Sequence, residues 1–382
     1  MIRERLFILA TLTKLTHKFI PQFNQMILNK LILSAAFLTL FISCTNNTST
    51  STNAGPTIQP LYVTEPVEFD TDDPAIWVNP ADPAQSLIIG TDKDENGGLY
   101  VYDLKGKIIT EKRVKGLKRP NNVDIAYGLT LGGKKVDVAI TTERMTNKIR
   151  VYSLPDMQPV DNGGIEVYVG ETNKMYRDLM GIALYTSPTG EIHAIVGRKT
   201  GPKDGTYLWQ YALADDGQGQ VKATLVRKFG NFSGKKEIEA IAVDNELGYI
   251  YYSDEQVGVR KYYADPAKGN KELALFATEG FTEDNEGISI YKTSDTTGYI
   301  LVSDQSANQF KVYSREGKDS AHHHALISSV KTATNQSDGS DMVSIPLNND
   351  FKHGLFVAMS DDKTFHLYRW EDIAGKTLKV NP

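Results

Sequence analysis

Acidic residues stand at the ends of strand-like segments along this 382-residue chain. Asp72 and Asp73 open the segment TDDPAIW, Glu239 and Glu255 flank the run AIAVDNELGYIYYSD, and Glu286 precedes GISIY. Carboxylates that are far apart in sequence but occupy equivalent points of a repeat can converge on one axis, where their oxygens bind hard cations. The pattern therefore predicts a calcium-dependent site.

The elements that would position these carboxylates repeat along the chain. A hydrophobic or aromatic strand that ends in tyrosine recurs before a turn, at Tyr102, Tyr152, Tyr211, Tyr262, Tyr313 and Tyr368. Successive tyrosines are 50 to 59 residues apart. This period is typical of propeller blades, each a four-stranded antiparallel sheet that cannot bury both of its faces alone. Six copies predict a six-bladed β-propeller.

The local pattern is that of an all-β protein. Short runs of alternating apolar and polar residues, such as GGLYVYDL and KVDVAITT, are separated by Gly, Asn, Asp and Pro. Such runs are typical of antiparallel strands joined by tight turns. No segment after residue 60 sustains a long apolar stripe of helical period. We therefore predict a single propeller domain over residues 58–382.

The N-terminal region predicts export. Residues 1–43 have the character of a signal-peptide region, because a lysine precedes an apolar stretch that ends at Cys44, the only cysteine in the chain. The junction FISC resembles a bacterial lipobox, which makes Cys44 the expected lipid anchor; an ordinary secretion signal and a membrane-spanning helix are the alternatives. Met26 offers an alternative start. Residues 44–57 are polar and unpatterned, as in a flexible linker. We expect a lipoprotein that faces the periplasm or the cell surface.

The net charge argues against one class of partner. The whole chain carries −5, and removal of residues 1–43 takes away five cations and one anion, which leaves −9. An acidic domain is a poor general binder of nucleic acid and is compatible with several bound Ca²⁺ ions. We expect a monomer that contacts the membrane only through its lipid anchor.

Several motifs resemble, in order and at similar separations, the blades of the β-propeller phytases. They are TDDPAIWVNPADP, PNNVDIAYG, GKKVDVAI, IEAIAVDNELGYIYYSDEQ, DNEGISIY and HGLFVA. The resemblance implies a six-bladed propeller that hydrolyses phytate (myo-inositol hexakisphosphate) or its calcium salt, with metal and substrate at one end of the central channel. A calcium-activated water would then attack phosphorus while lysines and arginines neutralise the phosphate oxygens.

The resemblance also implies the calcium ligands. They are expected to be Asp73, Asp124, Glu239, Glu255, Asp284, Glu286 and one or both of Asp338 and Asp341. Glu239 and Glu286 are the leading catalytic candidates, because each precedes an apolar strand in a well-matched motif; a solvated strand end is the alternative interpretation. Asn121 and Asn122 are further candidates for oxygen ligands, or they serve only to form a turn.

Phosphate-binding cations follow from the same resemblance. Lys93, Arg144 and Arg198 or Lys199 each follow a strand and precede a turn, at comparable points of successive blades. We expect these four residues to bind substrate, and Lys93 and Arg144 to act in catalysis together with the two glutamates.

Some features depart from the family pattern or leave other functions open. Asp94 follows Lys93 where the family usually has a second cation, and Met180 stands where the family has a tyrosine. The histidines at 322–324 are interpreted as part of a loop insertion rather than a transition-metal site. A calcium-dependent lactonase and a non-catalytic binding propeller are the rival functions; a lactonase has little need of cations aimed at phosphate, and a binding platform has little need of metal ligands.

Overall fold

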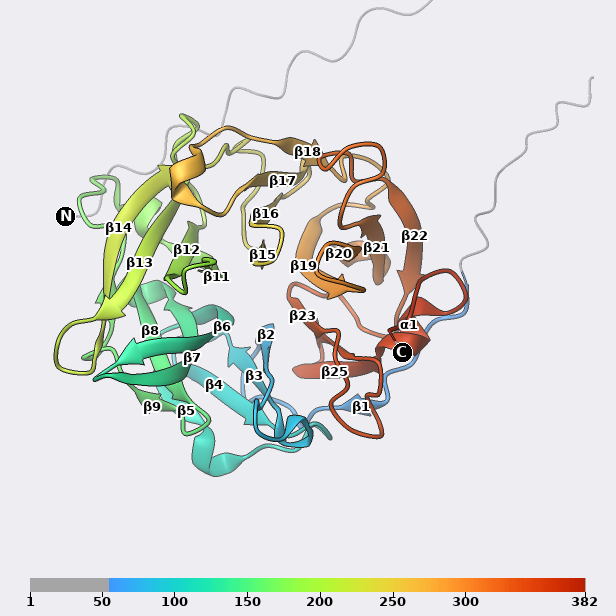
Figure 1. Cartoon of the computed structure of the whole chain (residues 1–382), viewed down its shortest axis with the longest axis horizontal. Coiled ribbons are helices and arrows are strands. Elements are labelled where there is room, and N and C mark those ends of the chain that lie inside the picture. The colour runs from blue at the N-terminus through green and yellow to red at the C-terminus, as the bar shows by residue number, and fades with distance from the viewer. Residues whose placement is uncertain (1–54, 382) are drawn as a thin grey trace, which may run out of the picture. The chain divides into compact units, whose positions relative to one another are not determined.

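The structure, a computed structural model, describes residues 55–381. Six antiparallel sheets are arranged radially around one axis, as the sequence predicts (Figure 1). The innermost strands of the six blades are β2 (Thr71–Trp77), β6 (Pro120–Leu131), β11 (Leu179–Thr186), β15 (Ile241–Asp244), β19 (Asn285–Lys292) and β23 (Ser340–Val343). The second strands are β3 (Leu87–Asp92), β7 (Lys134–Glu143), β12 (Ile192–Arg198), β16 (Tyr249–Asp254), β20 (Gly298–Asp304) and β24 (Leu355–Ser360).

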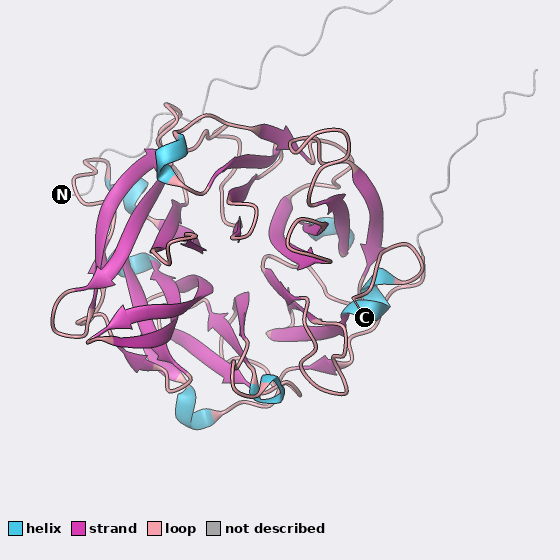
Figure 2. Ribbon diagram, viewed as in Figure 1, coloured by secondary structure: helices cyan, strands magenta, loops and turns pink. Residues whose placement is uncertain are grey.

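The two outer strands complete each sheet. The third strands are β4 (Gly97–Tyr102), β8 (Lys148–Leu154), β13 (Leu208–Asp215), β17 (Gly258–Tyr263), β21 (Gln309–Ser314) and β25 (Thr364–Arg369). The outermost strands are β5 (Val114–Leu117), β9 (Gln158–Pro159) together with β10 (Ile165–Glu166), β14 (Val221–Phe229), β18 (Ala274–Phe276), β22 (Leu326–Lys331) and β1 (Tyr62–Val63). Helices are short (Figure 2), and the one α-helix among the described residues is α1 (Trp370–Ala374).

The repeating tyrosines mark one structural position. Each of the six lies in the third strand of its blade and is buried. Core clusters combine residues of adjacent blades; one of them joins Val138 and Ile140 of the second blade to Leu184 and Val196 of the third. The tyrosine period therefore predicted the blade count because every blade must present the same packing position to its neighbour.

A strand from the beginning of the described region closes the ring. Tyr62 and Val63 of β1 pair with Leu367 and His366 of β25, so the last blade draws its outermost strand from the other end of the domain. This pairing joins the two ends of the repeat and leaves no open seam between the first and last blades of the described structure.

The predictions for the N-terminal region lie outside the described residues. They concern the signal-peptide region 1–43, the anchor Cys44 and most of the linker 44–57, and they stay predictions. Among the residues that the structure describes, no helix has the length and apolar character needed to cross a membrane.

Inner strands are irregular near their first residues. In β2, Asp72 and Asp73 together face Thr91 of β3, because one extra residue lies between the paired positions Thr71 and Pro74. The same irregularity occurs at the beginning of β6, β11 and β19. A bulge of this kind bends the strand and redirects a side chain that regular pleating would send into the sheet packing. These bulges position the candidate site.

Candidate functional site

The first residue of each bulge belongs to one ring of equivalent positions around the channel. Register fixes this position in β2, β6, β11 and β19. Backbone hydrogen bonds from Ser253 to Ala240 and from Met359 to Gly339 fix it just before β15 and β23. The six residues are Asp72, Asn121, Met180, Glu239, Glu286 and Asp338. Four of the six carry carboxylates, and one of the remaining two carries an amide.

A second set of equivalent residues follows the second strand of each blade. Because the first and second strands are antiparallel, the beginning of one lies beside the end of the other. In five blades, the residue at this position donates its backbone N–H to a carbonyl near the beginning of the first strand. The pairs are Lys93 with Asp70, Arg144 with Arg119, Lys199 with Asp178, Glu255 with Glu237, and Gln305 with Asp284. Both sets therefore lie at the same end of the propeller, which we call the mouth of the channel.

Three carboxylates of the ring share two polar partners. The Lys93 ammonium contacts the carboxylate of Asp72 and lies 3.4 Å from Oδ2 of Asp338. Asn121 donates from Nδ2 to Asp72 Oδ2 at 2.8 Å and also to Glu239 Oε1. Residues from blades one, two, four and six therefore meet across the channel, although as many as 266 positions separate them in the sequence. We call Asp72, Glu239 and Asp338 the first carboxylate group.

Burial dominates the electrostatics of this first group. Burial and the charge of Asp72 raise the pKa of Glu239 well above its usual range. Burial also raises the pKa of Asp338, to about 6. Although burial alone would lower the pKa of Lys93, the charges of these carboxylates outweigh burial and raise it. The mouth is thus a place where negative charge is costly and a cation is strongly favoured.

A second carboxylate group consists of Glu255, Asp284 and Glu286. One carboxylate oxygen from each lies within 4.8 Å of the other two, and all three side chains are buried. The Lys236 ammonium lies 3.0 Å from Oε2 of Glu255 and contacts Asp284. Burial raises the pKa of Glu255 to about 8, and burial with the charge of Glu255 raises that of Glu286 well above its usual range.

Glu237 connects the two groups. Its carboxylate lies within 4.8 Å of oxygens from Glu239 of the first group and Glu255 of the second. The two groups therefore form one acidic surface around the mouth rather than two separate patches.

The donor set at the mouth fits divalent cations that prefer oxygen. Among the described residues, no group offers a hydrogen bond to Oε1 of Glu255, to Oε2 of Glu286 or to Oδ1 of Asn121, although all three atoms are buried. Buried oxygens without donors are rare in proteins. Carboxylate and amide oxygens are the ligands that calcium takes, at about 2.3–2.6 Å. The residues present therefore suit calcium, and they include neither a thiol nor an imidazole.

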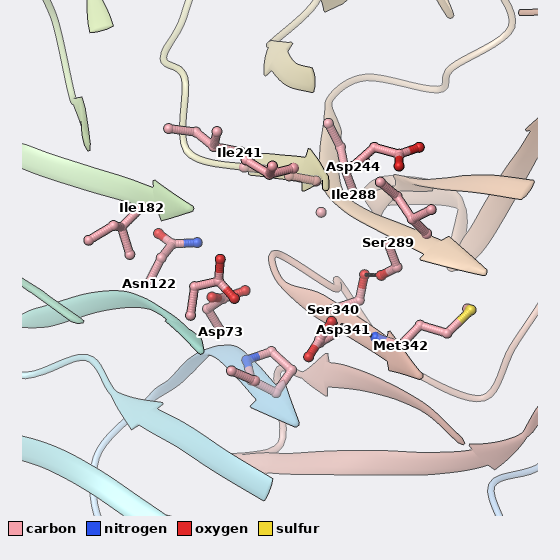
Figure 3. A pocket seen from close by; sticks show the side chains of 18 of the residues that line it. Asp73, Asn122, Ile182, Ile241, Asp244, Ile288, Ser289, Ser340, Asp341 and Met342 are labelled. Carbon is pink, nitrogen blue, oxygen red and sulfur yellow. Dashed lines mark hydrogen bonds between the residues drawn. The ribbon is translucent and has the colours of Figure 1, made fainter. Parts of the chain in front are cut away.

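Three of the predicted ligands lie deeper in the channel, around a cavity of about 160 Å³ (Figure 3). Asp73 accepts from the backbone N–H of Val123. Asp124 accepts from Leu184 N at 2.6 Å, and Asp341 from Ile76 N at 2.7 Å. Each of the three carboxylates thus fastens the inner strand of one blade to that of the next.

Asp73, Asp124 and Asp341 differ from the two groups at the mouth, because each accepts a backbone hydrogen bond from a neighbouring blade. Burial raises the pKa of Asp124 to about 7 and that of Asp341 to about 6, and it raises the pKa of Asp73 well above its usual range. The three carboxylates join blades and line one cavity together, and they are not members of the two carboxylate groups at the mouth; their assignment as calcium ligands stays a prediction.

The predicted cations are also at the mouth, with one exception. Arg144 pairs with Asp178 at 3.3 Å, and Lys199 pairs with Glu237 at 3.2 Å. Together with Lys93, they occupy equivalent positions in three consecutive blades.

Arg198 is the exception. Its side chain is fully buried, and its guanidinium donates to the carbonyls of Tyr176, Thr206 and Tyr207 and to the carboxylate of Glu171. The fully buried guanidinium makes four hydrogen bonds within the protein, so Arg198 is not placed to bind substrate. Of the two residues left open by the sequence, Lys199 is the structural equivalent of Lys93 and Arg144.

Sequence reasoning missed three residues at the mouth. Asp72 and its neighbour Asp73 were both expected among the cation-binding carboxylates; the structure places Asp72 in the ring, and the role of Asp73 as a calcium ligand stays a prediction. Gln305, which donates to Asp338, sits at the position equivalent to Lys93, and the repeat alone would have found it. Glu237 and Lys236 lie in an irregular segment before β15, where the sequence carries no periodic signal.

Met180 is the one apolar residue of the ring. Its side chain is buried, and its backbone carbonyl accepts from Thr142 Oγ1 at 2.7 Å. Gly181 follows, and a β-carbon there would lie 1.8 Å from the carbonyl oxygen of Glu239. The inner strands of the third and fourth blades therefore approach too closely for any other residue at position 181.

Comparisons with known proteins agree with this geometry. A family model described as phytase matches residues 25–376. The chain is 31% identical over 322 residues to a 3-phytase of Bacillus subtilis (strain 168), and the match covers 79% of this chain and 80% of that protein.

Proposed function

Because this chain belongs to the phytase family and is a hydrolase of the 3-phytase type, we propose that it removes phosphate from phytate in a calcium-dependent reaction. The observation that carries the proposal is the meeting of two buried carboxylate groups with Lys93, Arg144 and Lys199 at one mouth. Phytate carries many phosphates and associates with calcium, so its site needs metal ligands and phosphate-binding cations side by side.

The carboxylates hold the metal in this proposal. Asp72, Glu239 and Asp338 form one site, and Glu255, Asp284 and Glu286 form the other. Bound calcium would supply a water of lowered pKa and positive charge for the phosphate oxygens. The unsatisfied oxygens of Glu255 and Glu286 support the second site in particular.

The cations bind and orient the phosphate. Lys93 at the first carboxylate group and Arg144 and Lys199 on the neighbouring blades exchange their carboxylate partners for phosphate oxygens, and they offset the negative charge that the transition state spreads over those oxygens. Arg144 offers two parallel N–H groups, which suits a phosphate, whereas the lysines act as point charges. No nucleophilic side chain is required, because water attacks phosphorus directly.

Glu239 and Glu286 also accept and release protons in this proposal. Each is buried at the ring, and burial raises its pKa, which favours the protonated form in the absence of a nearby cation. With a cation bound at the mouth, both carboxylates would be held in the charged form.

A substrate panel tests the proposal. The protein is expected to release phosphate from phytate in the presence of calcium and to leave simple lactones unchanged. Lactone hydrolysis without phosphate release would replace the proposed phytase activity with a lactonase activity.

We also propose that the protein is exported and tethered through Cys44. The support is the sequence of residues 1–57. Loss of the protein from the membrane fraction in Cys44→Ser would support the tether, and unchanged fractionation would contradict it.

A further inference from the structure

Lys236 occupies the centre of the second carboxylate group. Its ammonium lies 3.0 Å from Oε2 of Glu255 and 4.0 Å from Oε1 of Glu286, and it contacts Oδ2 of Asp284. The three carboxylates have 0%, 5% and 9% of their side-chain surface exposed, whereas Lys236 is 37% exposed. One partly exposed cation thus faces three buried anions.

Lys236 has too little charge and too few hydrogen-bond donors for the three carboxylates of this group. A single ammonium brings one positive charge and three donors to three carboxylates with six oxygens. Among the described residues, both carboxylate oxygens of Glu255 and Oε2 of Glu286 accept no hydrogen bond, and Oε2 of Glu255 has only the ion pair with Lys236. Gln256 adds one hydrogen bond, from Nε2 to Asp284 Oδ1 at 3.0 Å, and no charge. The group therefore holds more negative charge and more acceptors than Lys236 can satisfy.

A divalent cation matches the negative charge and the acceptor oxygens that the Lys236 ammonium leaves unpaired. Calcium carries twice the charge and binds six to eight oxygens at about 2.3–2.6 Å. The carboxylate oxygens of the group lie within 4.8 Å of one another, so a cation bound to all three takes the place where the Lys236 ammonium now lies. Lysine and metal cannot occupy that place together, because both need the same oxygens and both are positive.

We propose that Lys236 is a built-in competitor for the metal at Glu255, Asp284 and Glu286. It neutralises part of the buried charge while no metal is bound, and it leaves for the solvent at the mouth when metal binds. This role rests on the calcium site of the proposed function. Lys236 thereby sets how much free calcium the enzyme needs, and it protects the metal-free fold from the repulsion of three buried carboxylates.

The segment that carries Lys236 suits such an exchange. Residues 230–240 form no strand, and Lys236 lies two residues after Gly234, which has a φ of +71°. Lysine also has a long flexible stem, so the ammonium can leave without a change in the inner strands. Among the described residues, the ammonium of the neighbouring Lys235 bonds to the carbonyl of Gln256 and pairs with none of the three carboxylates. Lys235 is therefore a matched control of equal charge in the same segment.

Calorimetric titration of Ca²⁺ into the metal-stripped protein tests this role. We expect Lys236→Met and Lys236→Gln to bind calcium about tenfold more tightly than the unsubstituted protein at one site, because the competing cation is gone. Lys235→Met is expected to bind within about twofold of it, because long-range repulsion at the surface is screened by salt. Lys236→Gln retains hydrogen-bond donors and serves if Lys236→Met does not fold.

Thermal unfolding gives a second readout that does not depend on activity. In EGTA, Lys236→Met is expected to melt below the unsubstituted protein, and with saturating calcium the difference is expected to disappear. Equal or weaker calcium binding in both Lys236 variants would overturn the competitor role and leave the calcium site intact. Absence of calcium binding in the unsubstituted protein would overturn the site and the role together.

Discussion

The carboxylates at the mouth are functional candidates because they are buried. Glu239 and Glu286 occupy equivalent ring positions on neighbouring blades, and both are surrounded by other carboxylates rather than by solvent. A buried anion without an adequate counter-charge is costly, and proteins retain such groups mainly at functional sites. Residue-level changes here should therefore reduce function while the fold is retained.

Glu239→Gln and Glu286→Gln are each expected to lower kcat for phytate about 100-fold, because an amide is a poorer metal ligand and cannot take a proton. The fold is expected to remain, since the substitution keeps the shape and removes buried charge. Steady-state kinetics with saturating calcium, together with circular dichroism, measures both effects. Glu111→Gln, at an exposed position, is the control. Near-normal kcat in both mouth variants would contradict the assignment.

Adjacent residues Arg198 and Lys199 are expected to respond differently to substitution. Arg198→Lys should destabilise the protein by about 3 kcal/mol, because lysine cannot serve the three carbonyls and the carboxylate of Glu171 that the buried guanidinium bonds. Lys199→Met should raise KM for phytate with little change in Tm. Chemical unfolding and kinetics on both variants check this division, and a normal KM in Lys199→Met would remove Lys199 from the substrate site.

At the scale of elements, the sequence predicted the strands better than the turns between them. Lys93 and Arg144 could be predicted because each directly follows a strand in the repeat. The bulges could not, since a single extra residue leaves no signal in the alternation of apolar and polar residues. Lys236 was missed because its segment has no regular structure at all.

The connection between β21 and β22 shows what the run of histidines does. His324 donates from Nδ1 to the carbonyl of Ser314 at 2.7 Å, and its Nε2 lies 3.1 Å from the Lys261 ammonium. Lys261 lies 3.7 Å from the centroid of the Tyr249 ring and bonds to the Ala321 carbonyl. The loop of the fifth blade is thus fastened to the fourth blade, as expected for a loop insertion rather than a metal site.

This loop is expected to be sensitive to acid. Burial and the charge of Lys261 lower the pKa of His324 to about 4, compared with 6.5 in the unfolded chain. The neutral form is populated in both states well above pH 6.5, and stability is lost as the pH falls from about 6.5 toward 4, because the unfolded chain takes up the proton first. The free energy of unfolding should therefore fall by about 3 kcal/mol between pH 6.5 and pH 4 because of His324. Tyr249 and Tyr251 are titratable groups in contact with Lys261, and Tyr251 also contacts His324.

Urea unfolding at pH 7.0, 5.5 and 4.5 measures this effect. His324→Asn should lose less unfolding free energy over the range than the unsubstituted protein does, whereas His323→Asn, at an exposed position, should behave like the latter. Parallel pH dependence in all three proteins would show that His324 carries no such contribution.

At the scale of the whole molecule, the propeller brings equivalent positions of the sequence repeat together at one site. Six blades bring positions such as Asp72, Glu239 and Asp338 to one mouth, and β1 closes the ring against β25 so that the mouth keeps its shape. The fold was predictable because the tyrosine period is a packing requirement of every blade. The site was only partly predictable, because sequence gives the blade position of a residue but not its depth along the channel, as Asp124 and Asp341 show.

Phosphate release from phytate, with calcium present and again after EGTA, tests the account most directly. We expect rapid release with calcium, loss of release in EGTA, and recovery when calcium is restored, because both carboxylate groups need a cation to accept an anionic substrate. Release that continues undiminished in EGTA, or no release by folded protein with calcium bound, would contradict the central claim.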